Sequence, residues 1–441
     1  MNNIFGTDGI RALVGSKKMH PEFVMRLGWA LGKTLEPNSK VLVGKDTRIS
    51  GYMFESALEA GLSAAGVHVL LLGPLPTPGI AYLTKTLRAQ AGIVISASHN
   101  PYYDNGIKLF LANGRKFTVQ KEQEIEKWLN QPMELVDSAQ LGKVNRINDA
   151  VSRYVEFCKS TVKHVSLKGL HIVLDCAHGA AYKTAPLVFS ELEATVTLLG
   201  DQPNGLNINN GVGSTHPELL SQTVKKLNAD IGIAFDGDAD RCIMCDATGR
   251  LIDGDEIMYL IAKDRLEHNK LSGPVVGTVM TNLGIERALE KLGIELIRAK
   301  VGDKYVLEQL LKHKGIIGGE ASGHIICLDA TSTGDGIVGS LQILRHLAQT
   351  NSSLAQSLQG VEKLPLQLIN VAVNNPKEVL QAEITTKAQE KFIKRLANKG
   401  RILIRASGTE PVIRVMVEGE NRTEVNEIAH KMASVIRGFV R

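Results

Sequence analysis

A candidate nucleophile, an imidazole and the end of a strand coincide in residues 96–101, which read Ser-Ala-Ser-His-Asn-Pro. An apolar run at 91–95 precedes them, and loops at strand ends commonly carry ligand-binding side chains. Ser98, directly before His99, can carry a transferred phosphoryl group as a covalent intermediate. Ser96 offers an equal hydroxyl, and the spacing alone does not choose between the two serines. A capped turn, in which these polar residues only begin a helix, is the structural alternative.

Basic side chains near this loop are suited to the same transfer. Lys108 follows in an Asn-Gly-Ile-Lys phrase, and Arg11 ends the glycine-rich phrase 5–11. Phosphoryl transfer requires positioning and charge neutralisation more than covalent help from the protein. His99 and Lys108 are therefore candidates to move a proton or to neutralise developing charge, and Arg11 to contact the transferring phosphate. The phrase 5–11 lacks the Lys-Ser/Thr pair of a P-loop, so it does not indicate nucleotide binding.

Three carboxylates crowd into residues 236–241, which read Asp-Gly-Asp-Ala-Asp-Arg. Two like charges about 4 Å apart repel by about 4 kcal/mol at an effective dielectric of about 20, and a hard cation with oxygen ligands reverses that repulsion. An EF-hand is excluded, because Arg241 and Ala247 stand where it needs glycine and glutamate. The loop therefore predicts a Mg²⁺ site, with Arg241 poised for a phosphate or for the carboxylates beside it. An exposed acidic turn is the alternative.

Two further polar loops lie at 319–324 and 405–411. The first offers a carboxylate, a hydroxyl and an imidazole, which suit sugar hydroxyls or an amino group paired with Glu320. The second resembles an anion nest, because its glycine lets backbone N–H groups converge while Arg405 supplies a charged fork. Arg414 lies just beyond it. A tight turn and a plain hairpin are the respective alternatives.

The polar loops must be positioned by larger elements, and three stretches of the chain share one plan. An apolar strand opens each stretch, helices follow, and a second strand ends in one of the polar loops. This predicts three related α/β layered domains with mixed sheets and helices on both sheet faces. A fourth unit has the order β-α-β-β-α, which predicts a smaller C-terminal α+β domain. We expect domains at 1–150, 151–250, 251–365 and 366–441, with a ligand cleft where they meet.

Composition limits the functional classes. The chain has 441 residues, of which 44% are hydrophobic and 22% charged, and it is too long for one core. No apolar run approaches the roughly 18 residues of a membrane helix, and the N-terminus leaves no room for a signal peptide, so we expect a cytoplasmic protein without a membrane partner. The scattered net charge of +5 indicates no nucleic-acid partner and suits a small anionic substrate. The five cysteines indicate buried structural thiols rather than a disulfide framework, a redox pair or a zinc site.

Five phrases, in this order, resemble the α-D-phosphohexomutase superfamily across essentially the whole chain: FGTDGIR, SASHNPYYDNGIK, DGDADR, GGEASGH and RASGTEP. They are most similar to bacterial members that interconvert glucosamine 6-phosphate and glucosamine 1-phosphate, on the route to UDP-N-acetylglucosamine and the cell wall. The resemblance implies an isomerase of four domains around a central cleft, with one Mg²⁺ per chain. It also implies activation by glucosamine 1,6-bisphosphate or by phosphorylation of the serine, and a homodimer as the expected assembly.

Carried over residue by residue, the resemblance places the phosphoserine at Ser98 and not at Ser96. The predicted catalytic set is Ser98, His99, Lys108 and Arg11, without fixing which residue is acid or base. The predicted metal ligands are Asp236, Asp238, Asp240 and a phosphate oxygen on Ser98. Together with the polar loops above, the predicted substrate-binding set is Glu320, Ser322, His324, Arg405, Ser407, Gly408, Thr409, Arg414 and Arg241.

The implied reaction is a two-step exchange. The phosphoserine gives its phosphoryl group to the free hydroxyl of the substrate, the bisphosphate turns around, and its other phosphate returns to the serine. Two positions depart from the family pattern: Ala12 stands where glycine is expected, and Ala321 stands where glutamine is expected beside the sugar-reading residues. The second departure leaves the preferred hexose phosphate open.

Three other functions are compatible with parts of the pattern. A phosphomannomutase/phosphoglucomutase would use the same chemistry on a sugar with a 2-hydroxyl group. A metal-dependent phosphatase would transfer the phosphoryl group to water, although Asp240 stands where haloacid-dehalogenase enzymes have threonine or valine. A sugar-phosphate sensor would bind without catalysis.

Overall fold

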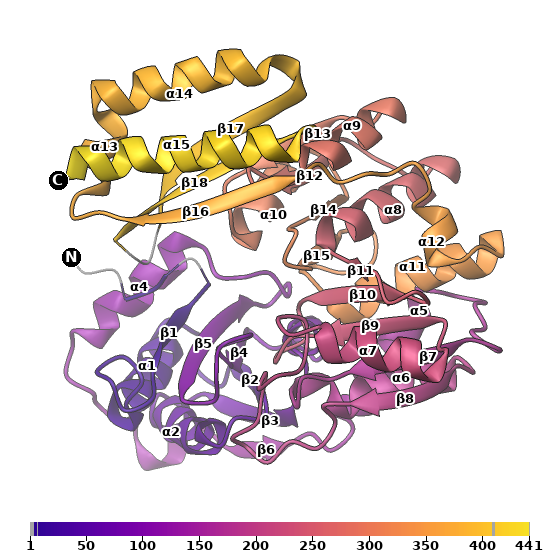
Figure 1. Ribbon diagram of the computed structural model, residues 1–441. Helices are drawn as coiled ribbons and strands as arrows, with labels where there is room; N and C mark the ends of the chain where they lie inside the picture. Colours follow the sequence, from indigo (N-terminus) through magenta and orange to yellow (C-terminus); the bar gives the residue numbers. More distant parts are fainter. Residues whose placement is uncertain (1–3, 7, 408–410, 441) are drawn as a thin grey trace. The chain divides into compact units, whose positions relative to one another are not determined.

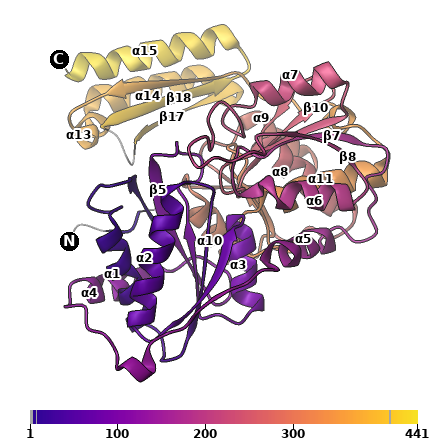
Figure 2. The same cartoon turned by 90° about the horizontal axis from the view of Figure 1, so that it is seen from below.

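Three mixed β-sheets make up the first part of the structure, and each has parallel strands followed at one edge by antiparallel strands (Figures 1 and 2). The structure is a computed structural model that describes residues 4–6, 8–407 and 411–440. It falls into two units: Met1–Met280 with Ile294–Gln359, and Thr281–Gly293 with Gly360–Arg441. In the described part of the chain, no helix is both long and apolar enough to span a membrane.

The first sheet has the strand order β1-β5-β4-β2-β3-β6. Its strands are β1 (Ile10–Leu13), β2 (Lys40–Lys45), β3 (His68–Pro74), β4 (Ala91–Ile95), β5 (Asp104–Leu111) and β6 (Val144–Arg146). The helices of this region are α1 (Pro21–Lys33), α2 (Ser50–Ala64), α3 (Thr77–Thr86), α4 (Val119–Leu129), η1 (Ser138–Gln140) and α5 (Ala150–Ser160). Helices α1 and α2 touch at Gly61, where a Cβ atom would lie 2.0 Å from the carbonyl oxygen of Met25.

The second sheet has the order β11-β10-β9-β7-β8, and the third has the order β13-β12-β14-β15. The second comprises β7 (His171–Asp175), β8 (Thr195–Leu199), β9 (Ile231–Phe235), β10 (Cys242–Asp246) and β11 (Leu251–Ile252), with η2 (Ala180–Tyr182), α6 (Thr184–Glu191) and α7 (Glu218–Leu227). The third comprises β12 (Val275–Thr278), β13 (Leu296–Ala299), β14 (Ile317–Gly319) and β15 (Ile325–Cys327), with α8 (Gly254–Glu267), α10 (Asp303–His313), α11 (Gly336–Thr350) and α12 (Leu354–Ser357).

Each predicted polar loop of this unit occupies the same place in its sheet. The serine loop (residues 96–101) joins β4 to β5, the aspartate loop (236–241) joins β9 to β10, and the glutamate loop (319–324) joins β14 to β15. In all three cases the loop connects the last strand of the parallel part to its antiparallel neighbour. The shared plan expected from the sequence is therefore present as a shared strand topology, and it fixes where each motif emerges.

The second unit has a small antiparallel sheet in the order β16-β18-β17. It comprises β16 (Leu366–Ala372), α13 (Pro376–Gln381), α14 (Glu383–Leu396), η3 (Ala397–Lys399), β17 (Gly400–Ala406), β18 (Val412–Gly419) and α15 (Arg422–Val440), joined by α9 (Leu283–Lys291). Its core places alternate residues of β18, such as Ile413 and Val415, against α15 residues such as Ile428. The predicted β-α-β-β-α order is confirmed, except that two helices replace the first one. The helical conformation is interrupted at Ala382, between α13 and α14, where the backbone is extended (φ −63°, ψ 133°).

Candidate active site

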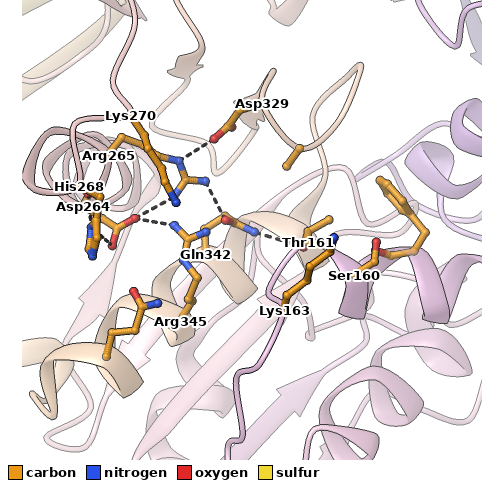
Figure 3. A pocket seen from close by; sticks show the side chains of 13 residues that line it. Ser160, Thr161, Lys163, Asp264, Arg265, His268, Lys270, Asp329, Gln342 and Arg345 are labelled. Carbon is orange, nitrogen blue, oxygen red and sulfur yellow. Dashed lines mark hydrogen bonds and ion pairs between the residues drawn. The ribbon is translucent and has the colours of Figure 1, made fainter.

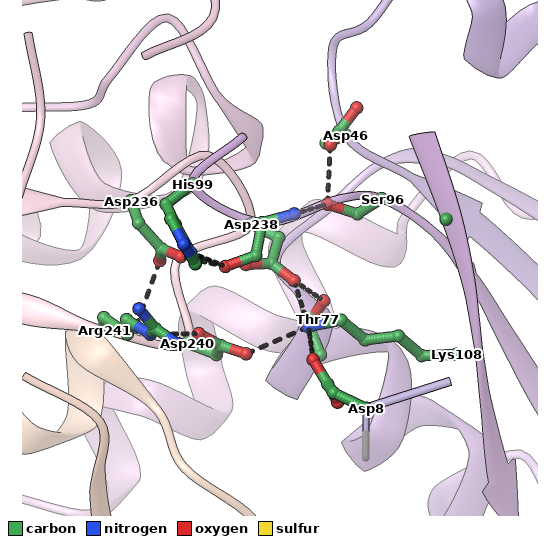
Figure 4. Close-up of polar contacts among 12 residues, drawn as sticks. Asp8, Asp46, Thr77, Ser96, His99, Lys108, Asp236, Asp238, Asp240 and Arg241 are labelled. Atoms are coloured by element: carbon green, nitrogen blue, oxygen red, sulfur yellow. Dashed lines mark hydrogen bonds and ion pairs between the residues drawn. The ribbon is translucent and has the colours of Figure 1, made fainter. Parts of the chain in front are cut away.

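Ser98 is buried in the loop that follows β4, and its hydroxyl group lies at the aspartate loop. Figure 4 shows the polar contacts of this region, with Ser96, His99 and Asp236 labelled. Its Oγ donates to Oδ2 of Asp236 at 2.6 Å and lies 3.3 Å from Nδ1 of His99. The backbone of Ser98 has a φ of +53°, the left-handed region that non-glycine residues seldom occupy. Strain of this kind, of order 1–3 kcal/mol, persists where surrounding contacts over-determine the conformation, and it clusters at functional sites.

The hydroxyl group of Ser96 is engaged differently. Its Oγ donates to Oδ2 of Asp46 at 2.6 Å and accepts the backbone N–H of Ser98 at 2.9 Å. Both of its hydrogen-bonding roles therefore maintain the loop. Two serines that spacing could not separate are distinguished by their partners, and the geometry favours Ser98 as the nucleophile.

Arg48 holds the serine loop in place, and sequence reasoning missed it. The guanidinium is fully buried, and its Nε donates to Oδ2 of Asp46 at 2.8 Å. Its two terminal nitrogens donate to four carbonyl oxygens of the serine loop: Ser98 at 2.9 Å, Asn100 at 2.8 Å, Asp104 at 3.2 Å, and Pro101. Asp46 and Arg48 directly follow β2, so the strand-end signal that identified the other loops could have identified this one.

The aspartate loop brings three carboxylates together. One oxygen each from Asp236, Asp238 and Asp240 lies within 4.8 Å of the other two, and all three residues are buried. The turn is closed by Ala239, whose φ is +57° and whose N–H donates to the carbonyl oxygen of Asp236 at 3.0 Å. Oδ1 of Asp238 is buried without a hydrogen bond from any described residue. This donor set of carboxylate oxygens fits a hard divalent cation.

Two carboxyl groups of this cluster have pKa values that are shifted in opposite directions. Burial raises the pKa of Asp236 well above its usual value, and Asp240 and Asp238 raise it further. Burial also opposes ionisation of Asp240, but Lys108 and His324 outweigh it and hold the pKa of Asp240 well below its usual value. Like-charge repulsion is therefore concentrated on Asp236, which a bound cation would relieve.

Lys108 is the basic residue at the centre of the cluster. Its Nζ lies 2.8 Å from Oδ2 of Asp238, 3.1 Å from Oδ2 of Asp240 and 3.2 Å from Oδ2 of Asp8. Burial opposes its charge, but these three carboxylates outweigh burial and hold the pKa of Lys108 well above its ordinary value. Lys108 is therefore protonated at neutral pH. Thr77 also reaches the loop, and its Oγ1 donates to Oδ2 of Asp238 at 2.6 Å.

Asp8 links further charged residues that the sequence did not single out. It pairs with the predicted residue Arg11 and with Lys116, and Lys116 in turn pairs with Asp303. His324 continues this network, because its Nε2 lies 3.4 Å from Oδ2 of Asp303 while its Nδ1 lies 3.5 Å from Oδ1 of Asp240. Burial opposes protonation of His324, yet the two carboxylates prevail and raise its pKa to about 8.

The remaining predicted residues of this unit have different environments. The backbone N–H of Arg241 donates to Oδ1 of Asp236 at 3.2 Å, and Oε1 of Glu320 accepts the N–H of Gly302 at 2.9 Å. Burial lowers the pKa of His99 to about 4, and the neighbouring guanidinium of Arg241 contributes, so the imidazole is neutral at neutral pH. Ser322 is exposed.

The predicted phosphate loop belongs to the second unit. Arg405 of β17 pairs in register with Arg414 of β18. The N–H of Ser407 donates to the carbonyl oxygen of Val412 at 2.9 Å and closes the base of the hairpin. Gly408 and Thr409 lie outside the described residues.

Family models and relatives account for nearly the whole chain. Residues 2–135, 152–249 and 253–364 match the alpha/beta/alpha domains I, II and III of phosphoglucomutase/phosphomannomutase, and residues 368–435 match the C-terminal domain. Phosphoglucosamine mutase of Hahella chejuensis is 54% identical over 440 residues, which is 99% of each chain. Phosphoglucosamine mutase of Azotobacter vinelandii is 55% identical over 435 residues, which is 98% of each chain.

Solved structures share the fold at lower identity. A phosphoglucomutase/phosphomannomutase family protein from Burkholderia thailandensis has a TM-score of 0.83 at 24% identity, over 99% of this chain and 97% of that one. N-acetylphosphoglucosamine mutase of Aspergillus fumigatus, solved with GlcNAc-6P and magnesium, has a TM-score of 0.69 at 18% identity, over 99% and 96% of the two chains. At these identities the structures establish the architecture alone.

Proposed function

The chain belongs to the phosphoglucosamine mutase family, and we propose that Ser98 carries the phosphoryl group during its reaction. As a member of this family it is an isomerase that interconverts glucosamine 6-phosphate and glucosamine 1-phosphate. The observation that carries the proposal is the 2.6 Å contact between Oγ of Ser98 and Oδ2 of Asp236, which sets a buried hydroxyl group against a cluster of carboxylates.

The proposed reaction begins with phosphorylated Ser98. The free hydroxyl oxygen of the sugar phosphate attacks phosphorus and the bond from phosphorus to Oγ breaks. The proton of the attacking hydroxyl goes to a base, and Oγ takes up a proton from an acid. The product is glucosamine 1,6-bisphosphate and unphosphorylated Ser98. After the intermediate has turned around, the same transfer runs in reverse and returns the other phosphoryl group to Oγ. Atoms and charge balance, so no further reactant is consumed.

The protonation states of the neighbouring residues indicate a different role for each. Lys108 is protonated, so it can supply positive charge or a proton to the transferring group but cannot accept a proton. His99 is neutral and 3.3 Å from Oγ of Ser98, so it is available as an acceptor. Arg48 and Asp46 hold the loop, and no group on the substrate needs to touch them.

The proposed metal ligands are Asp236, Asp238 and Asp240, together with a phosphate oxygen on Ser98. Mg²⁺ bound there would neutralise negative charge on the phosphoryl group. The unpaired Oδ1 of Asp238 and the raised pKa of Asp236 support this donor set.

The substrate-binding assignments complete the proposal. Glu320 and Ser322 would read the sugar, and the phosphate that is not transferred would bind the hairpin of the second unit that contains Arg405, Ser407, Gly408, Thr409 and Arg414. The product, a sugar 1-phosphate, would supply UDP-N-acetylglucosamine synthesis. Assembly as a homodimer remains a proposal.

Peptide mass spectrometry tests the nucleophile. Incubation with Mg²⁺ and glucosamine 1,6-bisphosphate should add one phosphoryl group at Ser98, and glucosamine 6-phosphate should discharge it. Ser98→Ala should abolish turnover, whereas Ser96→Ala should still be phosphorylated at Ser98. Phosphorylation at Ser96, or turnover by Ser98→Ala, would refute the assignment. Turnover of glucosamine, glucose and mannose phosphates side by side would measure the sugar preference that Ala321 leaves open.

A further inference from the structure

A polar cavity of about 530 Å³ lies in the first unit and contains none of the predicted catalytic or metal-binding residues (Figure 3). It is bounded by the end of α5, the end of α8, the segment after β15, and α11. Its lining residues are Phe157, Ser160, Thr161, Lys163, Asp264, Arg265, His268, Lys270, Asp329, Ala330, Gln342, Arg345 and Gln349. The volume is within the usual range for small-molecule sites, about 300–1,000 Å³.

The floor of the cavity is a preorganised charged network. The buried guanidinium of Arg265 donates to Asp329 at 2.7 Å, to Asp264 at 2.8 Å and to Gln342 at 2.8 Å. Arg345 also donates to Oδ2 of Asp264. The two carboxylates that line the cavity are therefore already neutralised by the two arginines.

Two ammonium groups remain. Lys163 and Lys270 are exposed, they follow α5 and α8 respectively, and neither forms an ion pair with any residue that the structure describes. The cavity thus carries four permanent cations against two carboxylates. Excess positive charge in a walled, polar cavity favours a ligand with more than one negative charge. Phosphate groups meet this requirement, since ammonium and guanidinium groups bind them through charge-assisted hydrogen bonds.

A second cavity, of about 580 Å³, adjoins the first and shares Phe157, Asp329 and Ala330 with it. Its lining is different in character. Tyr82 stacks on Phe157 there, with ring centroids 3.9 Å apart and planes inclined by 18°. Its two cations, Lys85 and Arg115, face Asp335 and the shared Asp329, which already pairs with Arg265, so the excess positive charge of the second cavity is smaller than that of the first. Aromatic side chains stack on planar bases with little preference for one base over another.

We propose that the two cavities together bind a nucleoside diphosphate. The diphosphate lies in the first cavity against Lys163, Lys270 and Arg345, and the base lies in the second against the Tyr82–Phe157 pair. This site is independent of the phosphohexomutase reaction, and its test needs no turnover.

Isothermal titration calorimetry of the full chain with UDP tests the proposal, with inorganic pyrophosphate as the probe for the phosphates alone. UDP should bind more tightly than pyrophosphate, because only UDP reaches the aromatic pair. The double variant Lys163→Ala, Lys270→Ala should weaken both ligands by at least about tenfold, since each loses charged hydrogen bonds. Lys226→Ala, an exposed lysine on α7, is the matched control and should change neither affinity.

Tyr82→Leu separates the two halves of the site, because it keeps apolar volume but removes the ring. It should weaken UDP several-fold and leave pyrophosphate unchanged. Glucosamine phosphate turnover should be normal in all of these variants, which shows that they are folded. Equal affinity for UDP and pyrophosphate would overturn the nucleoside assignment. Undiminished UDP binding by the double lysine variant, or no binding by the wild type at millimolar UDP, would overturn the site.

Discussion

Arg405 of β17 stands directly opposite Arg414 of β18 in the antiparallel ladder, so the two guanidinium side chains share one face of the small sheet. Burial lowers the pKa of Arg405, and the charge of Arg414 lowers it further. Like charges placed opposite one another cost a sheet roughly 0.2–1 kcal/mol. A register that carries this cost is suited to a site that receives an anion.

The variant Arg405→Met tests that relationship. Without phosphate it should be as stable as the wild type or more stable, by up to about 1 kcal/mol, because the cross-strand repulsion is gone. Inorganic phosphate should raise the melting temperature of the wild type and not that of the variant, since a ligand stabilises only the state that binds it. Differential scanning fluorimetry measures both effects. Lys391→Met, at an exposed residue of α14, is the control and should respond like the wild type. An equal phosphate response in Arg405→Met would contradict the prediction.

The variant Arg48→Lys tests how the serine loop is held. Lysine keeps the charge but cannot reach four carbonyl oxygens and Asp46 together, because it lacks the planar fork. We expect kcat to fall by at least about tenfold with little change in KM, and the free energy of unfolding to fall by roughly 3 kcal/mol. Steady-state kinetics and urea unfolding measure the two quantities. Arg153→Lys alters an exposed ion pair with Asp149 and should leave both unchanged. Wild-type kinetics in Arg48→Lys would show that the loop keeps its shape without the fork.

The variant Asp236→Asn tests the cation site. It removes one of three crowded carboxylates, so the variant should be at least as stable as the wild type in the presence of EDTA. Saturation with Mg²⁺ at about 100 times its dissociation constant should stabilise the wild type by about 2.7 kcal/mol. This gain should be lost in Asp236→Asn and retained in Asp137→Asn, an exposed carboxylate elsewhere in the first unit. Thermal unfolding in EDTA and in Mg²⁺ gives the comparison, and a wild-type Mg²⁺ response in Asp236→Asn would place the ion elsewhere.

Asp335 gives the stability of the chain a specific pH dependence. It is the N-cap residue of α11, where its side chain accepts the N–H of Val338 at 2.9 Å and the hydroxyl of Tyr154 at 2.8 Å, and burial raises its pKa to about 6. The unfolded carboxyl titrates near its ordinary value of 3.8, so between these pH values the folded state binds more protons. Its contribution to the free energy of unfolding therefore falls as pH rises through this window, by roughly 3 kcal/mol.

The variant Asp335→Asn removes this titration while keeping an oxygen acceptor for the start of α11. Relative to the wild type, it should gain stability as pH rises from about 4 to about 6 and hold that gain above pH 6. Urea unfolding across this range measures the difference between the two proteins. Curves that stay parallel at every pH would mean that Asp335 is ionised in the folded state with its ordinary pKa.

Much of this fold could be predicted from the sequence, because apolar runs followed by glycine-rich polar loops are local signals. They marked β4, β9 and β14 with the loops that follow each strand. The same signal after β2 was overlooked, although it held Asp46 and Arg48. The short helix α13 was also missed, because its 6 residues are too few to show a helical hydrophobic period.

Other parts of the site depend on contacts between distant segments, which no spacing encodes. Lys116 meets Asp8 and Asp303, which lie 108 and 187 residues away along the chain. The different uses of Ser96 and Ser98 are of the same kind, because identical side chains acquire different roles only from partners that the fold brings to them. Likewise, the residue types at Asp236 and Asp240 are the same, and only their neighbours make their pKa values diverge.

All five cysteines are free and buried, and all of them lie in the first unit. Their labelling can therefore report local opening of that unit. A thiol reagent can label them only when local opening admits it, and the labelling rate of each cysteine reports the free energy of that opening. Cys242 and Cys245 follow the aspartate loop on β10, so their protection should increase when a ligand holds that loop closed. The second unit has no cysteine and is not labelled. Ligand binding at the aspartate loop can therefore be followed through the native cysteines, without introducing another.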